Sequence, residues 1–230
     1  MGTREFRDIV FVTAMECEAE CVLAAFDDVR EANVSGRRVR YGRAGGVECA
    51  LIVSGIGKTL AAAAAEFAIL ALGAKTVLNV GLCGGFGGGV EIGGVYEVDK
   101  AAEYDFDISA FNGGLVGVKD GRSSPFVHLA ATGLFPARSL ATGDRFNDSD
   151  ADHRFIGETL GCSLRDMEGA AIAFVCEASG AECRAVKCVS DVADAESMTA
   201  QYLENKRLSL DALAAACRDL CHDISACQCK

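Results

Sequence analysis

The chain has 230 residues, half of them hydrophobic and two of them proline, and a formal net charge of −11. This length and composition suit one α/β domain over residues 1–230, with a large apolar core and little tendency to disorder. Lysine and arginine are scattered, which excludes nucleic acid as the partner, and no apolar run is long enough to span a membrane. We expect a small-molecule or protein partner.

The twelve cysteines could indicate disulfides or a metal site. Residues Met1–Asp8 are charged and lead straight into a predicted strand, unlike a secretory signal peptide. Several cysteines lie inside apolar runs, where reduced thiols behave as small hydrophobic side chains. The close cluster of Cys217, Cys221, Cys227 and Cys229 lacks paired zinc-site spacing, and a metal there is the less favoured alternative. We predict a cytoplasmic protein with reduced thiols, no metal and no cofactor.

Apolar periodicity and glycine turns predict alternating strands and helices. In the first part of the chain we expect a strand at 8–13, a helix from 14 that includes Ala25 and Phe26, strands at 37–43 and 47–53 joined by a hairpin turn, and a helix at 59–72. Strands at 75–80 and within 90–102 follow, and then a glycine-rich loop at 112–124. The last part is expected to form a strand and turn at 140–147, a helix at 150–160, a strand at 182–189 and a helix at 200–226. The last helix is expected to turn Leu203 and Leu213 toward the core.

The stretch from Leu164 to Gly180 begins with Asp166-Met167-Glu168 and continues as an apolar helix. A carboxylate at such a helix start most simply caps the helix or interacts with its dipole. A second acidic segment, Ser190-Asp191, ends the predicted strand that follows. Carboxylates at the ends of two adjacent elements are typical of an active-site edge.

Two glycine-rich turns follow predicted strands, at 54–58 and at 81–89, the second including Gly84. Neither has the spacing of a phosphate-binding loop or of the GxGxxG dinucleotide fingerprint. Glycines let a backbone approach a ligand closely, so these turns remain candidates for a binding site, whereas NAD binding is not expected.

Seven segments occur together in an order and spacing that match one family. They are AMECE at 14–18, SGIGK at 54–58, NVGLCGG at 79–85, YDFDISAF at 104–111, TGDRF at 142–146, DMEGAA at 166–171 and VSDVAD at 189–194. The chain thereby resembles the nucleoside phosphorylase and nucleosidase superfamily, and within it the methylthioadenosine/S-adenosylhomocysteine nucleosidases. The resemblance implies a three-layer α/β fold, a mixed twisted sheet flanked by helices, and release of adenine from 5′-thio-substituted nucleosides by hydrolysis of the N-glycosidic bond.

The resemblance also implies the catalytic residues. Asp191 matches the general acid that protonates purine N7, with Ser190 orienting it, and burial would have to raise its pKa. Glu168 matches the carboxylate that binds the ribose hydroxyls, with Met167 under the sugar. Glu18 matches the carboxylate that positions and deprotonates the attacking water. The substitutions Asp191→Asn and Glu18→Gln are each expected to abolish turnover and to leave the midpoint of thermal unfolding nearly unchanged.

The substrate-binding residues carried over are Met15, Ile56, Gly84, Ile108, Phe111, Phe146, Asn147 and Lys187. Phe146 would stack on adenine, and the pocket for the 5′ group would include Phe111 of the partner subunit in a homodimer. Lys187 stands where the family commonly has an arginine near the water.

Water rather than phosphate is the expected nucleophile. Phosphorylases of the superfamily resemble one another in an arginine that grips phosphate, and Asn79 occupies that position here. The carboxylate of Glu18 would repel phosphate, at a cost of about 1–4 kcal/mol at ~4 Å.

The chain departs from the family pattern at Leu82, Lys187, Asn112 and Asn147. Of these, Leu82, Asn112 and Asn147 leave room for a related futalosine-type purine nucleoside as substrate. A phosphorylase, or a nucleoside-binding protein without turnover, is a further alternative. The three carboxylates together argue against the second, because binding alone does not require all of them.

Overall fold

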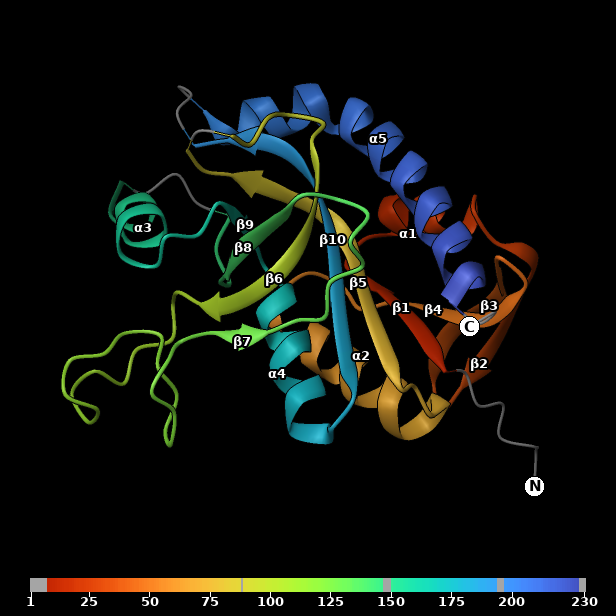
Figure 1. Ribbon diagram of the computed structural model, residues 1–230, viewed down its shortest axis with the longest axis horizontal. Coiled ribbons are helices and arrows are strands. Elements are labelled where there is room, and N and C mark those ends of the chain that lie inside the picture. The colour runs from red at the N-terminus through yellow and green to blue at the C-terminus, as the bar shows by residue number, and fades with distance from the viewer. Residues whose placement is uncertain (1–7, 88, 147–149, 194–196, 228–230) are drawn as a thin grey trace.

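The computed structural model describes residues 8–87, 89–146, 150–193 and 197–227. The strands are β1 (Ile9–Thr13), β2 (Asp27–Val34), β3 (Arg37–Ala44), β4 (Val47–Val53), β5 (Thr76–Gly85), β6 (Val95–Glu103), β7 (Val127–His128), β8 (Ala137–Thr142), β9 (Leu164–Asp166) and β10 (Glu182–Val192). The helices are α1 (Glu16–Leu23), α2 (Lys58–Leu72), α3 (Asp150–Arg154) with the π-helical turn η1 (Phe155–Thr159), α4 (Gly169–Ser179) and α5 (Met198–Cys227). The strands form a mixed sheet, and the helices lie in two layers on either side of it (Figure 1).

The sheet closes on itself over part of its length. Strands β10, β6, β8, β9 and β5 pair in that order, and β5 also pairs with β10, so these five strands form a ring. From β5 the sheet continues as an open wing through β1, β4, β3 and β2. Parallel and antiparallel pairs occur in both parts. The expected α/β fold with a mixed sheet flanked by helices is therefore confirmed, and ring closure is an added feature.

Each helical layer makes its own core with one side of the sheet. Helices α2 and α4 lie together on one side, and α5 lies over α1 on the other (Figure 1). On the inner face of α2, Ala61, Ala64, Ala65 and Ala68 are fully buried, and their small side chains let the helix lie close to the strands. Both α2 and α4 end at a left-handed glycine, Gly73 and Gly180, the usual signal of a helix C-terminus.

Three sequence expectations are corrected. β2 was not predicted, because the first five residues of this edge strand are exposed and charged residues dominate them, and only Ala32 and Val34 pack against the core. The first helix ends at Leu23, and Phe26 is nevertheless buried, edge-on to Phe11 with the ring centroids 5.2 Å apart. Leu203 is 69% exposed rather than part of the core, whereas Leu213 is fully buried as expected.

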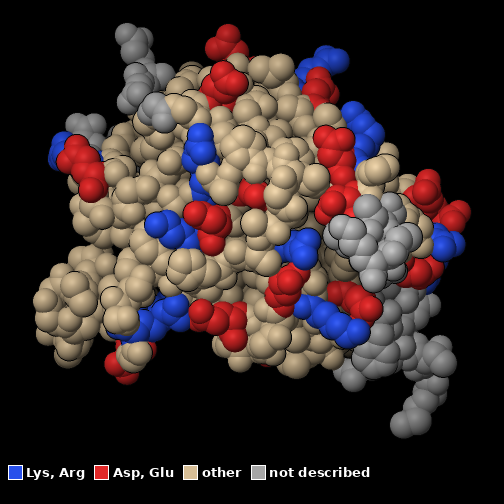
Figure 2. Space-filling view, in the orientation of Figure 1, with Lys and Arg blue, Asp and Glu red and all other residues tan. Residues whose placement is uncertain are grey.

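Figure 2 shows Lys and Arg interspersed with Asp and Glu on the face viewed. None of the helices in the described ranges is long and apolar enough to cross a membrane. Within those ranges, no three His, Cys, Asp or Glu side chains are grouped for a metal, and the described cysteines are free thiols. The side chains of Cys227 and Cys229 lie outside the described residues.

Candidate active site

One cavity of about 410 Å³ opens where the parallel strands β1, β4, β5 and β10 reach their carboxyl ends. In open α/β sheets this edge is the usual place for a ligand. The cavity is lined by Ala14, Met15, Glu18, Ile56, Leu82, Cys83, Gly84, Arg145, Phe146, Arg165, Asp166, Met167, Glu168, Ser190, Asp191, Thr199, Tyr202 and Leu203.

Most of the predicted site residues meet in this cavity. Those that line it are Met15, Glu18, Ile56, Gly84, Phe146, Met167, Glu168, Ser190 and Asp191. Ile108 and Phe111 do not, and they belong to the long loop that projects from the molecule at the lower left of Figure 1. Lys187 lies behind the cavity, 1% exposed. Asn147 lies outside the described residues.

Glu18 is held by the backbone of two neighbouring strand ends. Its Oε2 accepts hydrogen bonds from the N–H groups of Ala14 (3.0 Å) and Met15 (2.9 Å), and its Oε1 accepts one from Leu82 (2.8 Å). Gly81 makes this approach possible, because a Cβ there would lie 2.8 Å from Oε1. Burial raises the pKa of Glu18, while the three N–H groups and Lys187 oppose that shift. Leu82 donates this hydrogen bond through its backbone N–H, so the hydrogen bond does not depend on its side chain.

Glu168 lies at the start of α4. Its Oε1 accepts a hydrogen bond of 2.8 Å from the backbone N–H of Gly57, so the turn before α2 positions this carboxylate. Glu168 is 6% exposed. Burial, followed by the nearby charge of Asp166, raises the pKa of Glu168 to about 7, against the opposing effects of Lys187 and Gly57. Glu168 can therefore change its protonation state near neutral pH.

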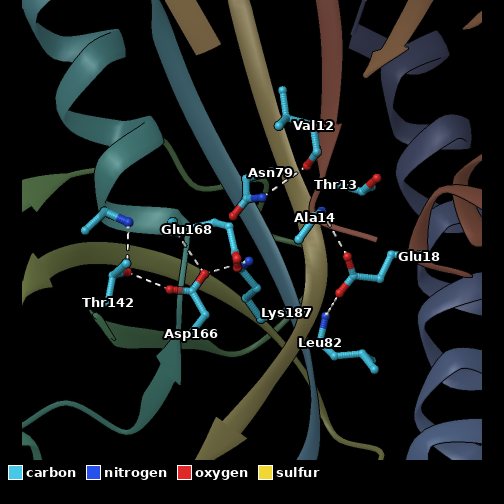
Figure 3. A network of polar contacts seen from close by, with 12 residues as sticks. Val12, Thr13, Ala14, Glu18, Asn79, Leu82, Thr142, Asp166, Glu168 and Lys187 are labelled. Atoms are coloured by element: carbon cyan, nitrogen blue, oxygen red, sulfur yellow. Dashed lines mark hydrogen bonds and ion pairs between the residues drawn. The ribbon is translucent and has the colours of Figure 1, made fainter. Parts of the chain in front are cut away.

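A buried ion pair supports the two glutamates from behind. Lys187 Nζ lies 2.8 Å from Asp166 Oδ2 (Figure 3). Asp166 also accepts hydrogen bonds from the hydroxyl of Thr142 (2.6 Å) and the backbone N–H of Gly169 (2.9 Å), which fixes the turn into α4. Burial lowers the pKa of Lys187, but the carboxylates of Asp166 and Glu168 outweigh it, so the pKa is raised and the ammonium stays charged.

Asp191 lies on β10 beside Gly84 of β5, to which it is paired. Both Asp191 and Ser190 are 1% exposed. The hydroxyl of Ser190 lies 2.7 Å from Asp191 Oδ1 and 3.2 Å from the carbonyl oxygen of Cys83, so it can donate to either. Glycine at 84 leaves room for this carboxyl, because a Cβ there would lie 3.0 Å from Asp191 Oδ2.

The opposite wall of the cavity is aromatic. Phe146 and Tyr202 meet edge to face, with ring centroids 5.6 Å apart, and Phe146 is 51% exposed. The guanidinium of Arg165 lies 6.0 Å from the centroid of Phe146. A half-exposed aromatic ring at a cavity edge offers a flat surface on which a planar heterocycle can stack.

Sequence reasoning missed several lining residues. Arg165, which neighbours Asp166 on β9, and Arg145 received no role, although both line the cavity. Thr199, Tyr202 and Leu203 come from the first turns of α5, far along the chain from the motifs. Leu203 is exposed because it lies at the cavity rather than in the core.

Known proteins resemble this chain over most of its length. Residues 8–222 match the family model of the phosphorylase superfamily. A 5′-methylthioadenosine/S-adenosylhomocysteine nucleosidase from Geobacillus thermodenitrificans is 31% identical over 84% of this chain and 88% of its own length. An aminodeoxyfutalosine nucleosidase from Campylobacter jejuni is 29% identical over 80% of this chain and 86% of its own.

A solved structure adds agreement in fold. The crystal structure of the Campylobacter jejuni 5′-methylthioadenosine/S-adenosylhomocysteine nucleosidase superimposes with a TM-score of 0.85 at 24% identity, covering 96% of this chain and 99% of that one. The futalosine hydrolase of Helicobacter pylori gives 0.82 at 23% identity, over 92% and 97% of the two chains. The family model matches nearly the whole described chain, and both relatives named above are nucleosidases. The chain therefore belongs to the phosphorylase superfamily, in its purine nucleosidase branch.

Proposed function

We propose that the protein hydrolyses the N-glycosidic bond of a purine nucleoside that carries a substituent at its 5′ carbon. One observation carries the proposal: the buried carboxyl groups of Glu18, Glu168 and Asp191 come from three different elements and line one cavity. As the C1′–N9 bond breaks, its electrons pass to the purine and positive charge develops on the ribose. The reaction therefore needs a proton donor at the purine, an anion near the sugar and a proton acceptor for the attacking water. The three groups supply these roles.

Asp191 donates a proton to purine N7, so that the C1′–N9 electron pair leaves with a neutral base. Glu168 binds the ribose hydroxyls and stabilises the positive charge that develops on the ring. Glu18 orients a water molecule toward C1′ and accepts its proton as the new C1′–O bond forms. The hydrogen bond from Gly57 and the Lys187–Asp166 pair keep Glu168 in place.

Water is the nucleophile in this proposal because the cavity offers phosphate an unfavourable position. Glu18, in the first turn of α1 just after β1, places a buried carboxylate in the cavity. Asn79, which stands in the place of the phosphorylase arginine, is 1% exposed and donates its side-chain N–H to the carbonyl oxygen of Val12 at 3.0 Å. It neither lines the cavity nor carries a charge.

The first candidate substrates are 5′-methylthioadenosine and S-adenosylhomocysteine, which the family resemblance indicates and on which named relatives act. A half-exposed Ile56 at the cavity suits an apolar 5′ group. The second candidate is a futalosine-type nucleoside. A specific observation favours it, the buried cation Arg165 at the cavity wall beside Phe146 and Asp191.

Release of free base from these nucleosides tests the reaction. We expect the same initial rate with and without inorganic phosphate, and free 5-substituted ribose rather than ribose 1-phosphate as the second product. A rate that requires phosphate would replace hydrolysis with phosphorolysis. Binding of the nucleosides without release of base would reduce the protein to a binding protein.

Ionisation of Glu168 predicts a pH-dependent cost to stability. Its pKa is about 7 in the folded protein against an ordinary value of 4.5, so folding is opposed by its ionisation above pH 7 and not below pH 4.5. The variant Glu168→Gln removes this penalty. We expect the midpoint of the variant, relative to wild type, to be higher at pH 9 than at pH 5, as measured by thermal unfolding.

The matched control is Glu66→Gln, an exposed carboxylate on α2, for which the difference from wild type should not change with pH. A difference for Glu168→Gln that is equally flat would contradict the raised pKa.

A homodimer stays our prediction. Phe111 is 91% exposed on the projecting loop and does not reach the cavity of its own chain. It is therefore available to complete the 5′ pocket of a second copy, and the mass of the protein in solution tests whether such a dimer forms.

A further inference from the structure

Arg165 is a buried cation placed on the wall of the cavity. It lies on β9, where it is paired with Gly84 of β5 and with Ala141 of β8. Arg165 and its neighbour Asp166 both line the cavity, and Asp166 is paired with Lys187 behind it. Arg165 is 4% exposed. The proposed hydrolysis has not yet given this buried guanidinium a role.

The side chain is held at the end of the cavity where the base would lie. Its guanidinium lies 5.8 Å from the centroid of Phe86 and 6.0 Å from that of Phe146, and Nη2 lies 3.7 Å from the sulfur of Met198. The faces of these two aromatic rings restrict the plane of the guanidinium. The group therefore presents its donors in a defined direction.

Gly84 places Arg165 and Asp191 on the same site. A Cβ on Gly84 would lie 3.0 Å from Asp191 Oδ2 and 3.7 Å from Arg165 Nε, so the two side chains flank the same glycine. Asp191 is the group that meets purine N7 in the proposed reaction. Arg165 is thus next to whatever the purine carries beside N7, which is the substituent on C6.

The chemistry of that edge separates two classes of purine. A 6-oxopurine presents two acceptors there, N7 and O6, whereas a 6-aminopurine presents the acceptor N7 and an N–H donor. Arginine has N–H donors and no acceptor, so it can bind O6 and can only oppose an amino group. Bidentate or paired arginine contacts to N7 and O6 are the commonest way in which proteins recognise this edge.

We propose that Arg165 makes the cavity selective for nucleosides of 6-oxopurines over the matching 6-aminopurines, by donating a hydrogen bond to O6 while Asp191 serves N7. The proposal rests on the proposed function and changes the order of its candidates, because 5′-methylthioadenosine and S-adenosylhomocysteine carry a 6-aminopurine and become the weaker substrates. The same contact stabilises the negative charge that spreads onto the purine as the C1′–N9 bond breaks, so it acts on kcat as well as on binding.

Two nucleosides that differ only at C6 test this selectivity, 5′-methylthioinosine and 5′-methylthioadenosine. We expect kcat/KM of the wild type to favour the inosine compound by roughly 5- to 150-fold, the range of one good contact of this kind. Arg165→Leu should remove most of that preference, chiefly by slowing the inosine compound. Arg165→Lys keeps the charge without the planar fork and should retain part of it.

Arg145→Leu is the matched control, because Arg145 is the other arginine on the cavity wall and its Nη1 lies 3.3 Å from a carboxylate oxygen of Asp152. It should leave the ratio between the two nucleosides unchanged. Equal ratios in wild type and Arg165→Leu would overturn the proposal, as would a wild-type preference for the adenosine compound.

Binding of the free bases separates failure of this proposal from failure of the hydrolase function. By calorimetry, hypoxanthine should bind wild type more tightly than adenine, and Arg165→Lys should narrow the gap even if Arg165→Leu does not fold. If neither nucleoside is cleaved but hypoxanthine is preferred, the selectivity stands and hydrolysis fails. If adenine binds as tightly as hypoxanthine, the selectivity fails regardless of turnover.

Discussion

Replacing Asp191 with asparagine is expected to lower kcat by roughly 10²–10⁴-fold, the contribution of one general acid. Asparagine has the same shape and keeps an oxygen for the hydroxyl of Ser190, which lies 2.7 Å from Asp191 Oδ1. It can also donate a hydrogen bond to purine N7, but it cannot transfer a proton. The thermal midpoint should therefore stay close to that of wild type while the base leaves as a costly anion.

The role of Asp191 can be separated from simple damage to the site by changing the leaving group. In a p-nitrophenyl 5-methylthioriboside, the leaving group is p-nitrophenolate, a stable anion that needs no proton to depart. The variant Asp191→Asn should cleave this compound at close to the wild-type rate. Equal losses on the purine nucleoside and the nitrophenyl compound would show that Asp191 positions the substrate rather than protonating it, and full activity on both would remove it from the mechanism.

Replacing Glu18 with glutamine is expected to abolish turnover and also to lower stability. The carboxylate accepts three backbone N–H groups, from Ala14, Met15 and Leu82. An amide has one oxygen, so its NH₂ group must face at least one of these donors, which costs about 1–3 kcal/mol for an unsatisfied buried group. In a chain of this size that corresponds to a thermal midpoint lower by about 2–12 °C.

Glu20→Gln is the matched control, because Glu20 belongs to the same helix and is exposed. It should leave both kcat and the midpoint unchanged. A Glu18→Gln variant with wild-type stability would show that the backbone donors relax around the amide. One that keeps wild-type turnover would show that another group activates the water.

The stability part of this prediction differs from what the sequence suggested. AMECE identifies Glu18 as the carboxylate near the water, and the structure places it at the cavity as expected. Its three donors come from two strand ends separated by more than sixty positions in the chain, and no local pattern reveals that contact. A substitution that looked neutral for folding is therefore expected to be destabilising.

The strands and helices with clear periodicity could be predicted from the sequence, and so could the lining residues that belong to contiguous motifs. β1, α2 and the apolar part of β10 have continuous apolar patterns that do not depend on distant neighbours. The glycine-rich segment 81–85 reads as a loop, but it continues β5 and pairs with β10. Gly81 and Gly84 leave the space that Glu18 and Asp191 occupy. These contacts exist only in the folded protein.

Arg165 shows the limit more sharply. In the sequence it is one charged residue before an acidic doublet, and a solvated side chain is the ordinary interpretation of such a residue. Only the pairing of β9 with Gly84 turns it into the cavity beside Asp191. The aromatic rings that flank it, Phe86 and Phe146, come from two other segments.

The closed ring of strands affects where the protein could pair with a second chain and aggregate. Strands β5, β9 and β10, which carry Gly84, Arg165 and Asp191, each pair with a strand on both sides over part of their length, so none of them is an edge strand. The wing ends instead at β2, whose Asp-Asp-Val-Arg-Glu sequence is charged and exposed. Charged edge strands resist pairing with a second chain. The fold thus keeps its unprotected edge as far as the sheet allows from the strands that form the site.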